Sequence, residues 1–190
     1  TADLVNHALG GKVFNQIVRA ARELGRPVPD VVPETTIGKY EGATVLDPKI
    51  GFYKDPITTL DFASLYPSIM IAENMCYNTY ITTPTDAKTN TYSTPNGDVS
   101  FVDASVRKGI LPTVLEMLLV ERRKYKKKML NETDPRLKAV FDATQLALKI
   151  SCNSIYGFTG VSKGILPLVY IALTVTTVGR DMIFRTKKYV

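Results

Sequence analysis

Two long amphipathic segments joined by a very short connection restrict the fold of this chain more than any other feature. The first predicted helix covers residues 111–130, and the second runs from Pro135, just after Asp134, to Tyr156. Asp134 is a good N-cap, and proline suits the first helical position because its missing N–H has no partner there. Only residues 131–133 separate the two helices, so we expect an antiparallel helical hairpin.

The second helix carries a narrow polar stripe. At about 100° per residue, six polar residues fall along one side of this helix. They are Lys138, Asp142, Gln145, Lys149, Asn153 and Tyr156. Apolar residues lie mostly opposite or beside the stripe, so one face is expected to pack in the core and the other to face a ligand. Gly157 is expected to end the helix.

The excess positive charge of the chain lies in the first helix of the hairpin. The formal net charge is +6, and the segment RRKYKKK at residues 122–128 carries all of this excess. Such a cluster favours polyanionic partners, with phosphate groups the obvious ones. It is equally typical of a solvated basic helix face.

The stretch TLDFASLYPSIM at residues 59–70 places a carboxylate, Asp61, after a β-branched run. We expect strands at 43–46 and 57–62, followed by a short helix that begins with Pro67. A carboxylate at a strand tip can hold Mg²⁺, which binds one or two carboxylates together with substrate phosphates. The neighbouring helix N-terminus would point free N–H groups at an anion. An aspartate at a strand end is also often a cap or turn residue.

Three cations could converge on the same place. Arg122 and Lys126 are four residues apart on one helix face, and Lys149 lies on the neighbouring helix. Together with Asp61 and a helix N-terminus, they describe a nucleoside triphosphate site. Each feature alone is weak, since a single helical lysine is usually solvated, and the interpretation depends on their convergence.

Several other classes of protein are disfavoured. Cys76 and Cys152 lie far apart and His7 is the only histidine, so neither a disulfide framework nor a zinc site is indicated and a reducing compartment is expected. The longest apolar run, residues 165–178, is shorter than a membrane span and predicts a buried helix, so no membrane association is expected.

Another helix is predicted at residues 3–24. The chain has no initiating methionine and ends in a predicted helix, so we expect it to be part of a longer protein.

Two motifs resemble those of the family B DNA polymerases. DFASLYPSIM, residues 61–70, is similar to the first polymerase motif of the family, and KISCNSIYG, residues 149–157, is similar to the second. The connecting segments YEGATV, TPNGD, RKGILP and QLALKIS resemble the delta branch, found in eukaryotes and large DNA viruses. The resemblance covers the chain from about Tyr40 onward and is weaker before it.

The resemblance implies an α+β fold: part of a polymerase palm, with an antiparallel sheet and helices, plus a helical-hairpin fingers unit. Four parts are expected in chain order. Residues 1–39 form a helix and connector leading into the palm, 40–106 a palm part with the first motif, 107–158 the fingers with the second motif, and 159–190 a return helix to the palm.

Residue roles at the first motif also follow from the resemblance. Asp61 would bind two catalytic Mg²⁺ ions in the complete enzyme, helped by the backbone carbonyl of Phe62. The backbone at Ser64, Leu65 and Tyr66 would cradle the triphosphate of the incoming nucleotide. The Tyr66 ring would lie under the sugar, where a ribose 2′-hydroxyl would collide with it.

The resemblance further implies that Arg122, Lys126 and Lys149 bind phosphates. Asn153 would lie close to the phosphates and Tyr156 close to the nascent base pair. From the residues alone, Tyr156 could equally close the helix end, and Asn153 could be a polar residue of the last turn.

Three residues are expected at the DNA by resemblance: Tyr40 and Gly42 along the template backbone, and Gly157 at the end of the second motif. The remaining basic residues of the cluster, Arg123, Lys124, Lys127 and Lys128, are expected to be mostly solvated, with some nonspecific affinity for DNA.

The implied function is that of a DNA-directed DNA polymerase, acting on primer–template DNA and dNTPs. A sliding clamp and accessory subunits are expected partners of the longer protein. The expected location is the nucleus for a cellular protein or the viral replication site for a viral one. Tyr66 disfavours an RNA-directed nucleotidyltransferase. The alternative is a non-catalytic nucleic-acid-binding module with a polymerase-like shell.

The sequence departs from the family pattern at the second catalytic carboxylate. Two-metal transfer needs carboxylates on both sides of the metals, and the family supplies the second from an aspartate-threonine-aspartate hairpin. The sequence contains no Asp-x-Asp and nothing that resembles the family's exonuclease or thumb. We therefore expect this chain alone to be inactive.

Overall fold

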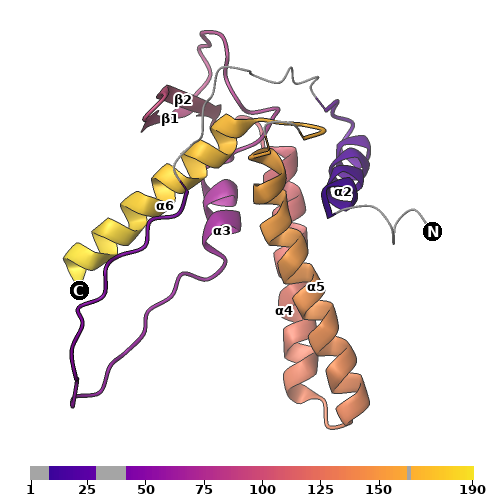
Figure 1. The fold of residues 1–190 in the computed structure, drawn as a ribbon. Coiled ribbons are helices and arrows are strands. Elements are labelled where there is room, and N and C mark those ends of the chain that lie inside the picture. Colours follow the sequence, from indigo (N-terminus) through magenta and orange to yellow (C-terminus); the bar gives the residue numbers. More distant parts are fainter. Residues whose placement is uncertain (1–8, 29–41, 162–163) are drawn as a thin grey trace.

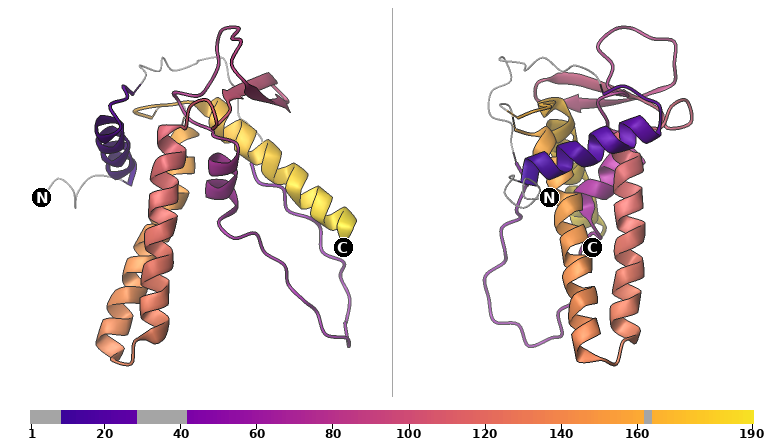
Figure 2. Two further views of the ribbon diagram at one scale, coloured as in Figure 1. Left: turned by 180° about the vertical axis from the view of Figure 1, so that it is seen from behind. Right: turned by 90° about the vertical axis from the view of Figure 1, so that its right-hand side faces the viewer.

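The computed structural model describes residues 9–28, 42–161 and 164–190. The described elements are, in chain order, α2 (Leu9–Glu23), α3 (Leu65–Ala72), β1 (Thr89–Thr94), β2 (Gly97–Val102), α4 (Ile110–Asn131), α5 (Pro135–Thr159) and α6 (Val169–Tyr189). Helices α4 and α5 form a long hairpin, and α6 diverges from it (Figure 1). The view from behind shows the same divergence, with the short α3 between the α4–α5 hairpin and α6 (Figure 2).

The α4–α5 hairpin confirms the antiparallel pair predicted from the sequence. The Asp134 side chain accepts a hydrogen bond from the Arg136 backbone N–H at 2.8 Å, so it caps α5 as expected. Helix α5 passes through Gly157 and ends at Thr159, so the predicted helix end was wrong. Glycine costs a helix only about 1 kcal/mol, and burial of Phe158 and Thr159 in the next positions offsets that cost.

The core lies at the base of the hairpin, where α3 contacts α4, α5 and α6. Its fully buried side chains come from every helix that meets there, and include Ile17, Met70, Leu111, Leu115, Ile155 and Ile171. The outer half of the hairpin is largely solvent-exposed. The core therefore fixes the position of α3 against the inner ends of the hairpin helices.

A buried asparagine ties α3 to the β1–β2 hairpin. Asn74 follows α3 in a left-handed conformation, with φ of 53°. Its side-chain amide donates hydrogen bonds to the backbone carbonyls of Val102 at 2.7 Å and Arg107 at 2.8 Å, and its carbonyl accepts one from the Gly109 N–H at 2.8 Å. Asn74 thus holds together the end of α3, the end of β2 and the start of α4.

The strands expected at 43–46 and 57–62 are absent from the described structure, and that prediction was wrong. Residues 42–62 form an extended excursion away from the core (Figure 1). A strand needs a neighbour for its backbone N–H and C=O groups, and the only sheet among the described residues is β1–β2. Apolar side chains of the excursion stay exposed, with Ile50 at 99% and Phe52 at 88%.

Helix α6 confirms the helix predicted near the C-terminal end. Its first half is buried, including Ile171 and Val175, whereas its last turn carries Lys187 and Lys188. None of the described helices is both long enough and apolar enough to cross a membrane.

Candidate functional site

A pocket of about 710 Å³ lies between the N-terminal end of α3 and the α4–α5 hairpin. We call it the central pocket. All ten residues expected at the metal or the nucleotide line it: Asp61, Phe62, Ser64, Leu65, Tyr66, Arg122, Lys126, Lys149, Asn153 and Tyr156. Segments separated by up to about half the chain thus share one cavity, although the role of each residue stays a prediction.

The wall around α3 presents a helix N-terminus. The helix begins at Leu65, two residues earlier than predicted, and Pro67 lies within its first turn, where a missing N–H leaves no intrahelical bond unmade. Ser64 precedes the helix with φ of 52°, a left-handed conformation that is unfavourable for a residue with a Cβ. Its side chain makes no capping hydrogen bond. The Ser64 side chain therefore does not cap the N-terminus of α3, which faces the pocket.

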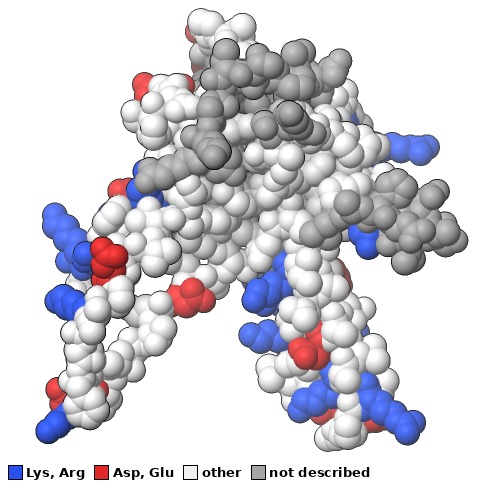
Figure 3. Space-filling model, in the orientation of Figure 1, with Lys and Arg blue, Asp and Glu red and all other residues white. Residues whose placement is uncertain are grey.

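The hairpin wall supplies the positive charge. Arg122 and Lys126 come from α4, and Lys149 from α5. Figure 3 shows Lys and Arg side chains on the side of the hairpin that faces α6 and residues 42–62. The Arg122 Nη1 donates to the Ser64 Oγ at 3.4 Å, a long hydrogen bond that spans the two walls.

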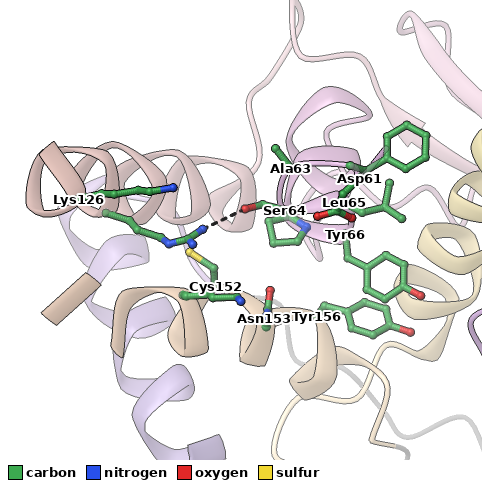
Figure 4. Close-up of a pocket in the computed structure, with 13 residues that line it drawn as sticks. Asp61, Ala63, Ser64, Leu65, Tyr66, Lys126, Cys152, Asn153 and Tyr156 are labelled. Atoms are coloured by element: carbon green, nitrogen blue, oxygen red, sulfur yellow. Dashed lines mark hydrogen bonds between the residues drawn. The ribbon is translucent and has the colours of Figure 1, made fainter. Parts of the chain in front are cut away.

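Two tyrosines close one end of the pocket. The Tyr66 and Tyr156 ring centroids are 4.5 Å apart with an interplanar angle of 39°, and Figure 4 shows them side by side, with Lys126 at the opposite end. Behind Tyr66 lies Gly179 of α6, where an added Cβ would be 3.4 Å from the ring Cε1. The Tyr66 ring is therefore held between Tyr156 and the backbone of α6.

The structure also places at the site two residues to which the sequence had assigned no individual role. Cys152 lines the pocket, and burial raises the pKa of its thiol, an effect that the positive charge of Arg122 opposes. Gln145 lies next to the pocket and accepts a hydrogen bond from Arg122 Nε at 3.4 Å. Helical spacing could have indicated both, since Gln145 is four residues before Lys149 and Cys152 is four before Tyr156.

Gly42 and Gly157, two of the three residues expected at the DNA, are not among the residues that line the central pocket. Gly42 is exposed at the start of the excursion, and Gly157 lies on α5 with no atom within 4 Å of an added Cβ. Tyr40 lies outside the described residues. Their roles stay predictions.

The acidic part of the pocket consists of one exposed carboxylate, Asp61, among its lining residues. The described residues contain no group of three His, Cys, Asp or Glu side chains that could hold a metal ion. One carboxylate beside an anion-binding wall fits a Mg²⁺ ion that arrives with phosphates, because Mg²⁺ needs few protein ligands in such complexes. It does not by itself provide a two-metal centre.

Comparison with known proteins agrees with this geometry. Residues 3–190 match the sequence pattern that describes DNA polymerase family B. The chain belongs to DNA polymerase family B. The match confirms the resemblance stated from the two motifs, and it starts well before Tyr40.

Curated relatives identify the branch of the family. The chain is 49% identical over 185 residues to the DNA polymerase delta catalytic subunit of Schizosaccharomyces pombe, covering 94% of this chain and 17% of that protein. It is 47% identical over 184 residues to the same subunit of Candida albicans, covering 94% of this chain and 18% of that protein. The chain thus spans less than a fifth of the length of these relatives.

A solved structure supports the fold assignment. The structure of the family B DNA polymerase from the hyperthermophilic archaeon Pyrobaculum calidifontis matches with a TM-score of 0.73 and 27% sequence identity. The match covers 98% of this chain and 24% of that one. The expected α+β fold, part of a family B polymerase, is therefore confirmed, while the limits proposed for its four parts stay predictions.

Proposed function

We propose that this chain is the nucleotide-binding part of a DNA-directed DNA polymerase that adds dNMP from a dNTP to a primer 3′-hydroxyl. One observation carries the proposal. A single carboxylate, the N-terminus of α3 and three cations, which come from different parts of the sequence, line one pocket in a family B chain.

The arrangement of the pocket supports one orientation of the nucleotide. The cations Arg122, Lys126 and Lys149 and the first N–H groups of α3 would bind the triphosphate, because both attract phosphate oxygens. The sugar and base would lie at the opposite end, against Tyr66 and Tyr156. Asp61 and the Phe62 carbonyl would hold Mg²⁺, which neutralises phosphate charge and favours attack at phosphorus.

The transfer follows from this orientation. The primer 3′-hydroxyl loses its proton to water and its oxygen attacks the α-phosphorus, the bond from that phosphorus to the bridging oxygen breaks, and pyrophosphate leaves with the bonding electrons. Negative charge grows on the departing oxygens, where the three cations and the α3 N–H groups can stabilise it. The residues of this chain thus act mainly by positioning and by charge.

The tyrosine end of the pocket supports a preference for deoxyribonucleotides. Tyr66 is backed by α6 at Gly179 and flanked by Tyr156, so its ring has little room to move away. A ribose 2′-hydroxyl at this wall would collide with the ring, whereas a deoxyribose would not.

We further propose primer–template DNA as the main partner, with Tyr40, Gly42 and Gly157 near its backbone. A sliding clamp and accessory subunits would contact the longer protein. The relatives named above come from eukaryotes, which supports a nuclear location. A viral protein would act at the viral replication site.

The first test compares two lysines of α5. Lys149 lines the central pocket, whereas Lys138 lies on the same helix outside it, and each alanine substitution removes one positive charge. Calorimetric titration of the 190-residue chain with Mg·dATP should show about tenfold weaker binding for Lys149→Ala, since a charge-assisted hydrogen bond contributes roughly 1.5–3 kcal/mol. Lys138→Ala should change binding by less than about twofold, because Lys138 lies outside the pocket and attraction between distant solvated charges is largely screened.

Two results would count against the proposal. Equal losses in the two variants would mean that only general charge attracts the nucleotide. Binding of DNA without selective binding of Mg·dATP by the unmodified chain would favour the alternative, a non-catalytic nucleic-acid-binding module.

A further inference from the structure

The orientation of Arg122 decides what the central pocket can recognise. Its guanidinium carries five N–H donors in a rigid plane and accepts no hydrogen bonds. Arg122 is only half-buried on α4, and a long side chain in that position samples many rotamers unless its neighbours hold it. The groups that accept hydrogen bonds from Arg122 therefore determine where its remaining donors point.

We propose that Gln145, oriented by Asp142, is a positioning residue that aims Arg122 into the pocket. Arg122 Nε donates to Gln145 Oε1 at 3.4 Å, across the interface between α4 and α5. Gln145 Nε2 donates to Asp142 Oδ1 at 2.8 Å, one turn earlier on α5. The three side chains thus form a relay in which only Arg122 lines the pocket.

Hydrogen-bond polarity gives the relay a direction. An ionised carboxylate only accepts hydrogen bonds, so the Gln145 NH₂ group must face Asp142. The amide oxygen then faces the opposite way, toward Arg122, which can only donate. If the amide were reversed, its NH₂ would face the arginine donors and its oxygen would face the carboxylate, so neither pair could form a hydrogen bond. Asp142 therefore selects the one amide orientation that can hold Arg122.

The same bond leaves the outer end of the guanidinium for the pocket. With Nε occupied by Gln145, Nη1 reaches Ser64 Oγ at 3.4 Å on the other wall. Because Arg122 lines the pocket, the relay leaves its remaining donors for a ligand there. That the ligand of these donors is a triphosphate rests on the proposed function, whereas the relay itself rests on the contacts among the three side chains.

The simpler interpretation is that Asp142 and Gln145 only stabilise α5. Pairs spaced by three residues are common on helix surfaces and give a small stabilisation of the helix. Such a pair would not depend on Arg122. A dependence of the Gln145 effect on Arg122 therefore separates positioning from a purely structural role.

The test replaces Gln145 with methionine, which keeps the length and helix propensity of the side chain but accepts no comparable hydrogen bond. Inorganic tripolyphosphate is the probe, because it has neither sugar nor base. We expect Gln145→Met to weaken its binding to the 190-residue chain roughly five- to tenfold. Ser154→Ala is the matched control on α5. The Ser154 hydroxyl donates to the Ile150 carbonyl of its own helix, and Ser154 does not line the pocket, so this variant should leave binding unchanged.

A double-variant cycle gives the deciding measurement. In the presence of Arg122→Ala, adding Gln145→Met should cause no further loss of tripolyphosphate binding. Additive losses, or an unchanged affinity in the single Gln145→Met variant, would overturn the proposal.

For Asp142→Ala, a simple charge effect and the relay predict opposite changes in tripolyphosphate binding. Removing a negative charge near an anion site should by itself strengthen tripolyphosphate binding. The relay instead predicts weaker binding, by roughly two- to threefold, because the Gln145 amide is released. Stronger binding by Asp142→Ala would contradict the relay.

A measurement without ligand separates this proposal from the proposed function. Nuclear magnetic resonance of the arginine side chains reports solvent exchange of the Arg122 Nε–H group, which the Gln145 bond should slow. Gln145→Met should increase that exchange rate several-fold while leaving that of Arg123 Nε unchanged, since Arg123 Nε donates to the Leu119 carbonyl. If tripolyphosphate did not bind the unmodified chain, the proposed function would fail. The exchange rates would then decide the relay by themselves, and an unchanged Arg122 rate would overturn it.

Discussion

Tyr66 combines an observed packing role with the role in sugar selection that we propose for it. Its ring contacts Tyr156 on one side, and α6 at Gly179 limits it on another. A ring held in this way acts on a ligand by occupying space, and such an effect falls on one sugar only. That asymmetry makes its role testable.

Truncation of Tyr66 should relax sugar selection. In an active polymerase that carries this segment, Tyr66→Ala should raise kcat/KM for a ribonucleotide relative to the matching deoxyribonucleotide by roughly tenfold or more, because it removes a repulsive contact made by one substrate. The measurement is the ratio of the two kcat/KM values for the same base opposite the same template.

The matched control keeps the ring. Tyr66→Phe removes only the hydroxyl and should leave the ratio close to that of the unmodified enzyme. If Tyr66 served only the core, Tyr66→Ala would instead lower both kcat/KM values together, and the protein would lose roughly 3–5 kcal/mol of stability.

At the residue scale, the structure brings together residues that two short motifs had grouped, and their roles stay predictions. Asp61, Tyr66, Lys149 and Asn153 were expected at one site from two short motifs, and they line one pocket. Gln145 was seen only as part of a polar stripe, because its contact with Arg122 depends on how α4 and α5 are rotated against each other. Sequence spacing within one helix cannot supply that rotation.

At the scale of elements, the helices were predictable and the strands were not. Helix α5 begins where Asp134 and Pro135 indicated, because capping depends on adjacent residues. The excursion at residues 42–62 has strand-like composition but no paired neighbour among the described residues, and a strand depends on that neighbour. Composition alone therefore over-predicted the sheet.

Gly157 offers a prediction about helix α5. An added Cβ there meets no atom within 4 Å, and the residue is not at positive φ. Gly157→Ala should therefore raise the free energy of unfolding by up to about 1 kcal/mol, because alanine favours the helix. If Gly157 also approaches DNA, the same variant should bind primer–template DNA less tightly. Denaturant unfolding and a DNA-binding titration measure the two effects.

Gly25 is the control for that prediction. It follows α2 at φ of 61°, where its N–H donates to the Arg22 carbonyl at 3.1 Å. Gly25→Ala should destabilise the chain by about 1 kcal/mol, because alanine resists this conformation. A stability loss in Gly157→Ala would contradict the structure of α5, whereas unchanged DNA binding would remove the support for contact between Gly157 and DNA.

At the scale of the whole molecule, the central pocket lies where the segment around α3 meets the α4–α5 hairpin. One wall belongs to the segment around α3 and the other to the hairpin, and they share the core at the hairpin base. The sequence predicted both walls, but the position of α3 between the hairpin and α6 comes from packing of many separate side chains. Such packing leaves no single signal in the sequence.

The purified 190-residue chain should not extend a primer. The described residues place one carboxylate in the pocket, and two-metal transfer needs carboxylates on both sides of the metals. Incubation with primer–template DNA, dNTPs and Mg²⁺ should give no elongated product on a denaturing gel, although Mg·dATP should still bind. Template-dependent elongation above a control without protein would show that this reasoning about the carboxylates is wrong.

The contact between Tyr66 and Gly179 has a consequence for how this pocket could change over evolutionary time. In the proposed orientation the sugar faces Tyr66, and the depth of the pocket there depends on how closely α6 approaches the Tyr66 ring at Gly179. A side chain gained at position 179 would push the ring forward and narrow the cavity, although no residue in contact with the ligand had changed. If Tyr66 selects the sugar as proposed, the substrate range would depend partly on position 179, which lies outside the residues that line the pocket.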